Sequence, residues 1–361
     1  MTVFDARFKY NLRIFTNALL PWAVRSIGRI WTIQGLYRNA MKAQKRRMRV
    51  QKEMGFPVPP TVVFSITSYC NLSCDFCYSR DYNETYSLPQ ELFEGALTQA
   101  KELGCFFFTL TGGEPLLYPN LLEVLSHHPD AVFFLITNGT RITSTTADVL
   151  SKHPNIIPII SLEGGAEATD RRRGEGVYQQ ISNGVRYLRE RDSLFGFSIT
   201  VTSQNCYSLQ KEAIFEEQFP LDSRLGFFIE YVPAGKMPDY SLCLTQEQRS
   251  SFRQWFLCLK ASKNMFLVHF PGDEELLYGC REAGKGFVHI NPQGFVEPCA
   301  LIQNDKYNIN KMPFKACLGA LFSEVNRHGD DYSNIENHPC MASFSKDFLQ
   351  KTSGSVVRIM V

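Results

Sequence analysis

The sequence predicts an α/β fold in which a parallel sheet follows a helical segment and precedes a smaller α+β region. The main observation is a repeat. Between residues 61 and 231, short apolar segments rich in β-branched and aromatic residues alternate six times with segments of helical periodicity. Such repeats favour parallel strands joined by covering helices. The expected strands are residues 61–67, 106–111, 131–137, 156–161, 196–202 and 226–231.

The connecting segments predict the covering helices and divide the chain into regions. A chain of 361 residues is long enough for one large α/β domain and a smaller one. We expect a helical extension at 1–57, the core at 58–240 and a third region at 241–361. The expected helices are residues 89–103, 120–127, 145–152, 177–191, 209–219 and 245–261.

The composition favours a cytoplasmic protein that uses its cysteines for metal. No apolar run is as long as a transmembrane span, and the N-terminus does not resemble a signal peptide. Eleven cysteines without an export signal favour metal-binding thiolates over a disulfide framework. The net charge is only +2, so we expect no nucleic-acid partner.

The N-terminal extension is basic and carries an apolar arc. Residues 1–53 hold twelve Lys and Arg but only two acidic residues, a local net charge of +10. A helix over 21–37 with this arc is typical of a segment that contacts a membrane peripherally. The alternative is a helix that covers the sheet or meets a second copy. The arc contains Trp22, Ala23, Val24, Ile27, Ile30, Trp31, Ile33 and Tyr37.

Three cysteines follow the first expected strand, in the stretch S-Y-C-N-L-S-C-D-F-C over 68–77. Cys70, Cys74 and Cys77 have the spacing C-x3-C-x2-C. Three thiolates can bind three irons of a cubane cluster, which otherwise takes four cysteine ligands. The fourth iron then stays open to a small molecule. The alternative is a zinc knuckle or a set of core thiols, although zinc usually takes C-x2-C pairs or cysteine with histidine.

This motif resembles that of the radical S-adenosylmethionine (SAM) family. The resemblance implies a partial (β/α)6 TIM-like barrel, a [4Fe-4S] cluster that binds SAM, and an external one-electron donor of flavodoxin or ferredoxin type. It also implies reductive cleavage of SAM to a 5′-deoxyadenosyl radical, which abstracts hydrogen from a peptide, a lipid or a small metabolite. Phe76 stands where the family places an aromatic ring near the adenine. A non-enzymatic iron–sulfur carrier or scaffold remains the alternative.

The ends of the next strands carry further motifs. T-G-G-E-P follows the second strand, and the family implies that Gly112, Gly113 and Glu114 receive the amino group of SAM. Glycine permits close backbone approach, and a carboxylate accepts hydrogen bonds from an ammonium group. T-N-G follows the third strand and makes Asn138 a candidate contact. A plain turn is the alternative for the Gly-Gly-Glu motif.

The fourth strand ends in S-L-E-G, where the family implies that Ser161 and Glu163 bind SAM. The alternative is strand-end polar residues that face water. Arg173 precedes a glycine as in the family's following loop, whereas we expect Arg171 and Arg172 to be solvated. Glu230 is a candidate substrate contact if its strand turns it toward the barrel mouth.

The third region contains a second set of cysteines. Cys280 and Cys299 flank a Pro-Gln-Gly turn in the spacing C-x13-G-x4-C. This resembles the first half of the SPASM/twitch extensions of radical SAM enzymes, which hold auxiliary iron–sulfur clusters. The full cysteine pattern does not follow, so the count allows one auxiliary [4Fe-4S] cluster. Cys340 is the expected third ligand and Cys317 a candidate fourth. Two buried hairpin cysteines without metal are the alternative.

Overall fold

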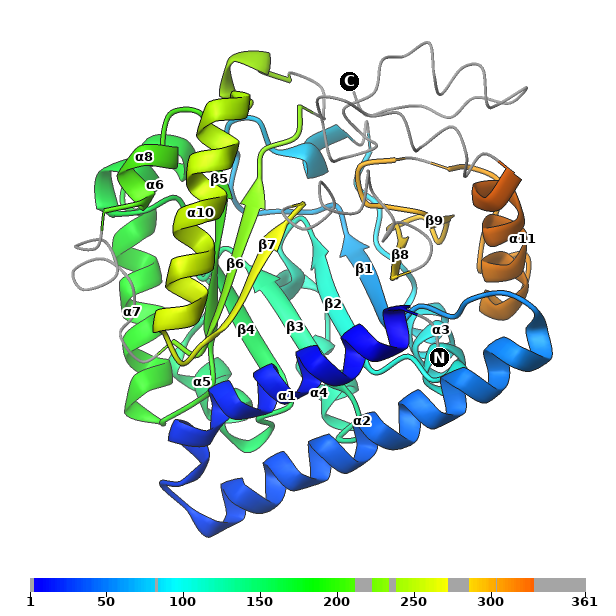
Figure 1. The fold of residues 1–361 in the computed structure, drawn as a ribbon. Coiled ribbons are helices and arrows are strands. Elements are labelled where there is room, and N and C mark those ends of the chain that lie inside the picture. The colour runs from blue at the N-terminus through cyan, green and yellow to red at the C-terminus, as the bar shows by residue number, and fades with distance from the viewer. Residues whose placement is uncertain are drawn as a thin grey trace.

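A single curled sheet of nine strands organises the chain (Figure 1). The computed structural model describes residues 3–81, 84–211, 223–233, 238–271, 286–302 and 304–327. The strand order is β7-β6-β5-β4-β3-β2-β1-β8-β9, and every neighbouring pair is parallel except β8 and β9. The strands are β1 Thr61–Thr67, β2 Phe107–Gly112, β3 Val132–Thr137, β4 Ile156–Leu162, β5 Gly196–Val201, β6 Leu225–Glu230, β7 Phe266–Phe270, β8 Phe287–Ile290 and β9 Val296–Glu297.

Helices cover the convex side of this half-barrel, as the alternating sequence pattern predicts. The six expected strands are confirmed to within one residue, and so are five of the six expected helices. The expected helix at 209–219 lies largely outside the described residues. The helices after the first strand are α3 Gln90–Leu103, α4 Leu121–Ser126, α5 Ser144–Lys152, α6 Ala166–Arg173, α7 Val177–Glu190, α8 Cys206–Leu209, α10 Gln246–Ser262 and α11 Phe314–Arg327, with short 3-10 turns η1 Tyr78–Asp81, η2 Pro115–Leu117 and η3 Tyr240–Leu242.

Alternation along the strands gives the sheet two apolar faces with different partners. Side chains such as Phe64, Phe108 and Phe133 point outward and form one core with the covering helices. The intervening residues, among them Phe107 and Phe134, point inward and belong to a second cluster. The inward aromatic residues stand near the starts of their strands.

Helix α1, Val3–Ala23, fills the inner side of the sheet at that end (Figure 1). Phe15 is 1% exposed, and its ring centroid lies 5.8 Å from that of Phe107, 6.0 Å from Phe134 and 5.5 Å from Phe266. Edge-to-face contacts of this kind add to the burial of apolar area. The alternative that the extension covers the sheet is therefore confirmed for α1, and the C-terminal ends of the strands remain for chemistry.

The expected continuous helix at 21–37 is wrong. Helix α1 ends at Ala23, and α2, Ile27–Met54, begins after a turn at Ser26. A residue far along the chain stabilises this turn: the indole Nε1 of Trp22 donates to the carbonyl oxygen of Asp192 at 2.7 Å. Arg25 and Arg29 both pair with the Asp192 carboxylate. Trp22, Ala23 and Ile33 are consequently buried, so the apolar arc does not stay together.

Strands β7 and β8 extend the six expected strands on opposite sides, and β7 and β9 form the two edges of the sheet. β7 pairs with β6, and β8 pairs with β1 from Thr61 opposite Phe287 onward. The expected hairpin is confirmed in β8 and β9, and Gly294 has the positive φ of 86° that its turn requires. No helix in the described part of the chain is long and apolar enough to cross a bilayer.

Replacing Phe15 by Ala should reduce the free energy of unfolding by about 3–5 kcal/mol, because it leaves a cavity among the inward rings. Tyr10→Ala is the matched control on the same helix, since Tyr10 is 61% exposed. We expect the control to change stability by no more than about 0.5 kcal/mol. Urea unfolding measures both, and equal losses would contradict the internal position of α1.

Candidate functional site

The three motif cysteines lie on the loop that follows β1, at the carboxyl edge of the sheet. All three are half-buried. Burial raises the pKa of Cys70 to about 11, a hydrogen bond from the Leu72 backbone opposes this, and the nearby thiols of Cys74 and Cys77 raise it further. Cys74 and Cys77 are therefore close enough to Cys70 to affect the pKa of its thiol. Without metal the Cys70 thiol is protonated near neutral pH, and iron would displace its proton.

Backbone contacts hold this loop against the loop after β2. The Gly113 N–H donates to the Thr67 carbonyl at 2.7 Å, and the Glu114 N–H donates to the Tyr69 carbonyl at 2.8 Å. A Cβ on Gly112 would lie 2.2 Å from the Thr67 oxygen, and one on Gly113 would lie 2.1 Å from the Tyr69 oxygen. The two glycines therefore permit close approach of the protein's own backbone. The sequence motif predicts instead that they permit close approach of a ligand.

The Glu114 carboxylate connects the second and third strands. Its Oε1 accepts from the Leu116 N–H at 3.0 Å and from Thr137 Oγ1 at 2.7 Å, and its Oε2 accepts from the Asn138 N–H at 2.7 Å. Burial raises the pKa of Glu114, and these hydrogen bonds oppose the shift. The side chain is thus satisfied inside the protein, and its contact with a SAM ammonium stays a prediction.

Asn138 reaches from the end of β3 to the cysteine loop. Its Nδ2 donates to Asn71 Oδ1 at 3.0 Å and lies 3.9 Å from Cys70 Sγ. Its Oδ1 accepts from the Thr140 N–H at 2.9 Å, which fixes the orientation of the amide. The predicted site residues Asn138, Glu114 and Cys70 are therefore brought together. Phe76 adopts a positive φ of 55° beside Cys77, an uncommon backbone for a bulky residue.

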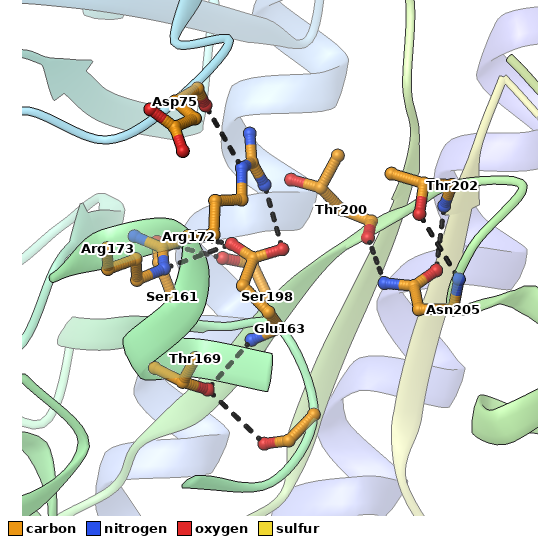
Figure 2. Close-up of polar contacts among 11 residues, drawn as sticks. Asp75, Ser161, Glu163, Thr169, Arg172, Arg173, Ser198, Thr200, Thr202 and Asn205 are labelled. Carbon is orange, nitrogen blue, oxygen red and sulfur yellow. Dashed lines mark hydrogen bonds and ion pairs between the residues drawn. The ribbon is translucent and has the colours of Figure 1, made fainter. Parts of the chain in front are cut away.

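The end of β4 forms a buried carboxylate clamp (Figure 2). Arg172 Nη1 donates to Glu163 Oε2 at 2.8 Å, and Arg173 Nε donates to Glu163 Oε1 at 3.0 Å. The Glu163 side chain is only 5% exposed. Ser161 Oγ lies 3.2 Å from Ser198 Oγ on β5, so it too has a protein partner. Two arginines and one glutamate leave this clamp with one excess positive charge.

Arg172 corrects an expectation, because its side chain is only 21% exposed and is not a solvated charge. Its Nε donates to the Asp75 carbonyl at 3.3 Å, and its own carbonyl accepts from the Asp75 N–H at 3.2 Å. Arg172 therefore ties the cysteine loop to Glu163, as Figure 2 shows. The run of three arginines gives no sign of which one turns inward. Arg171 is exposed and pairs with Glu167 on the surface.

Glu230 is not at the barrel mouth. It shares the outward side of β6 with Phe228, which lies in the outer core. Arg249 of α10 donates through Nε to Glu230 Oε1 at 2.8 Å, and both side chains are buried. The expectation that Glu230 contacts substrate is therefore wrong, because the register of the strand points it toward α10.

The second cysteine set is only partly within the described residues, because Cys280 and Cys340 lie outside them. Cys299 is 6% exposed and follows β9. Both Cys299 and Cys77 contribute to raising the pKa of the buried Tyr78, which burial raises to about 12, so the hairpin lies near the first cysteine loop. Cys317 is fully buried in α11, and its Sγ donates to the Met312 carbonyl at 3.7 Å.

A buried network that the sequence does not predict joins this hairpin to β1. Ser65 Oγ lies 2.7 Å from His289 Nε2, and His289 Nδ1 lies 2.6 Å from Glu297 Oε2. Asn291 Nδ2 also donates to Glu297 Oε1 at 2.8 Å. Burial raises the pKa of Glu297, and the His289 ring opposes the shift. The network holds the strand before Cys299 against the strand before Cys70.

Comparison with known proteins finds a family that is similar to the central part of this chain. Residues 64–203 match the model of the Radical SAM superfamily. The AdoMet-dependent heme synthase of Nitratidesulfovibrio vulgaris is 24% identical over 297 residues, covering 73% of this chain and 79% of that protein. The mycofactocin maturase MftC of Mycolicibacterium smegmatis is 28% identical over 283 residues, covering 72% and 69%.

A solved structure supports the fold independently. Streptococcus suis SuiB bound to S-adenosylmethionine has a TM-score of 0.61 and 19% sequence identity, covering 84% of this chain and 73% of that one. Similarity at this level of identity shows a shared half-barrel fold and carries no residue roles. The family match, in contrast, spans the strand with the three-cysteine loop and the Gly-Gly-Glu and Glu163 motifs. Residues 64–203 of this chain are therefore similar to the radical SAM superfamily.

Proposed function

We propose that this chain is a radical SAM enzyme that cleaves SAM reductively at a [4Fe-4S] cluster held by Cys70, Cys74 and Cys77. The observation that carries the proposal is the docking of this three-thiol loop on the Gly112–Gly113 bend and on the Glu163 clamp, at the carboxyl edge of the sheet. Parallel α/β barrels place their chemistry at this edge. An external one-electron donor of flavodoxin or ferredoxin type would reduce the cluster.

The donor set fits such a cluster. Three thiols occupy one loop, none is in a disulfide, and each is half-buried. Among the described residues, no three His, Cys, Asp or Glu side chains converge as ligands of a single metal ion. The ligands of a cubane bind different irons and need not converge in that way. When bound, the cluster supplies the electron that breaks a carbon–sulfur bond of SAM and so generates the 5′-deoxyadenosyl radical.

The chain's own residues would then bind and orient SAM. The excess positive charge of the clamp suits the carboxylate of SAM, with Arg173 as its nearest candidate partner and Ser161 beside it. The amino group would meet the Gly112–Glu114 bend, where Glu114 supplies negative charge and backbone carbonyls complete the contact. Asn138 and Arg172 would hold the cysteine loop in position. Phe76, between Asp75 and Cys77, remains the candidate for contact with the adenine.

The proposal is confined to this SAM step, because the relatives differ in what their names state. One is a heme synthase and one a mycofactocin maturase, and SuiB has also been solved with a precursor peptide. We therefore keep all three substrate classes for this chain: a peptide, a lipid or a small metabolite. We also propose one auxiliary [4Fe-4S] cluster of SPASM/twitch type on Cys280, Cys299 and Cys340, with the fully buried Cys317 as a core thiol.

The first prediction concerns SAM. Reconstituted under anaerobic conditions and reduced with dithionite, the protein should release 5′-deoxyadenosine, measured by chromatography. Cys74→Ala should abolish this product, because a cluster ligand is lost. Cys206→Ala is the matched control, since Cys206 is buried beneath α10 rather than on the loop. A cluster-bearing wild type that releases no 5′-deoxyadenosine would instead support an iron–sulfur carrier.

The second prediction distinguishes the role of Arg172 from that of the neighbouring Arg171. Arg172→Ala removes charge-assisted hydrogen bonds to Glu163 and Asp75, each worth about 1.5–3 kcal/mol, so SAM cleavage should fall about ten-fold or more. In the apo-protein the backbone amides of the cysteine loop should also exchange with deuterium faster, because the loop is released. Peptide mass spectrometry measures this without any cluster.

Arg171→Ala is the control for this experiment. Arg171 and Glu167 are 71% and 87% exposed, and exposed pairs contribute about 0–1 kcal/mol. We expect unchanged SAM cleavage and amide exchange in this variant, and partial recovery in Arg172→Lys. If both alanine variants behave alike, the clamp does not position the loop.

The third prediction concerns the auxiliary site. With two clusters the protein should contain about eight irons, and Cys280→Ala/Cys299→Ala should contain about four. Cys317→Ala should keep the wild-type iron content, because its thiol donates to the Met312 carbonyl inside the core. Iron and sulfide analysis measures both. A wild type with one cluster's worth of iron removes the auxiliary site, and loss of iron in Cys317→Ala makes Cys317 a ligand.

A further inference from the structure

The outer side of the α1–α2 hairpin exposes a group of large apolar side chains. Val24, Ile27 and Trp31 are 67%, 75% and 59% exposed, and Leu20 and Ile30 beside them are also exposed. They gather at the turn between the helices, at one corner of the molecule (Figure 1). Clustered exposed apolar residues of this kind mark interaction sites more often than single ones do.

Cations continue along the same side of α2. Arg38, Lys42, Lys45 and Arg49 follow one another at intervals of three or four residues, and all four are exposed. The opposite side of the helix carries Ile33, Leu36 and Ala40, which are buried against α1 and the sheet. The exposed side of α2 is therefore apolar near the turn and basic toward its C-terminal end.

A groove between the two helices opens on this surface. Its volume is about 430 Å³. Leu20, Ile33 and Tyr37 supply apolar wall, and Arg38 stands at the rim with its Nε bonded to the Gln34 carbonyl. The remaining lining residues, Thr16, Asn17 and Gln34, are polar and uncharged. The groove thus combines an apolar interior with a cation at its edge.

We propose that this outer side of the hairpin docks the protein on the surface of an anionic phospholipid bilayer. Val24, Ile27 and Trp31 would enter the interface, where indole and aliphatic side chains are favoured. Arg38, Lys42, Lys45 and Arg49 would meet the headgroups. Each basic residue near an anionic leaflet contributes about 1 kcal/mol, and the attraction declines within a Debye length.

The positive charge of the N-terminal extension favours a bilayer over a second copy of the chain as the partner of this face. Residues 1–53 carry a net charge of +10, so a symmetric contact between two such faces would bring like charges together. An anionic leaflet neutralises them instead. The docked face also lies beyond the starts of the strands, whereas the cysteine loop lies at their ends. The proposed SAM site would therefore open toward water, where an electron donor can reach it.

The test uses the full chain and extruded vesicles. Wild type should float with vesicles containing one third phosphatidylglycerol, bind pure phosphatidylcholine at least about ten-fold more weakly, and dissociate as salt is raised. The fluorescence of Trp31 should shift to shorter wavelength on binding. Trp31→Phe should remove that shift although Trp22 and Trp255 remain.

Charge-insertion variants complete the experiment. Ile27→Glu/Trp31→Glu and, separately, Lys42→Glu/Lys45→Glu should each weaken flotation at least about ten-fold. Leu257→Glu is the matched control, because Leu257 is 52% exposed on the distant helix α10. All variants should keep wild-type thermal unfolding and SAM cleavage, which separates this proposal from the proposed activity.

Three results would overturn the inference. If the wild-type protein does not float with anionic vesicles, a membrane is not the partner of this face. Variants that float like wild type show that these side chains are not the contact. A wild-type dimer in analytical ultracentrifugation that Ile27→Glu/Trp31→Glu dissociates, without vesicle binding, assigns the face to a second copy.

Discussion

Close backbone contact between the loops after β1 and β2 is the constraint on which the site depends. Gly112 and Gly113 have no Cβ, and any side chain there would collide with the carbonyl oxygens of Thr67 or Tyr69. The contact sets where the cysteine loop starts. Arg172 then holds the middle of the loop through Asp75, and Asn138 contacts its beginning near Cys70. The ends of β2 and β3 and the helix α6 thus fix one loop from three directions.

The two faces of the sheet divide stability from chemistry. Outward residues pack under helices in the manner common to α/β barrels, whereas the inner side is filled at one end by α1. Helix α1 therefore takes the place of the strands that would complete a closed barrel. The polar and titratable residues collect at the other end of the strands. An N-terminal extension that a sequence comparison would set aside is consequently part of the core.

Much of the fold follows from the sequence, because periodicity and turn residues are local signals. The six strands, the covering helices and the hairpin before Cys299 are all visible in that way. The three-cysteine spacing likewise predicts the family similarity that residues 64–203 show. The failures involve distant partners. The turn before Ile27 depends on Asp192, and Arg172 turns inward only because Glu163 and Asp75 meet it there. Glu230 was misplaced because a strand shifted by one residue presents its other side.

The pairing of β1 with β8 has a consequence for how the chain is made. β1 is synthesised well before β8, its second neighbour, which begins only at Phe287. Until β8 is made, one edge of β1 has no partner, and Ser65 lacks its contact with His289. Long-range pairing of this kind slows folding and leaves nascent edges open to wrong contacts. The cysteine loop would therefore reach its final support only after β8 has been synthesised.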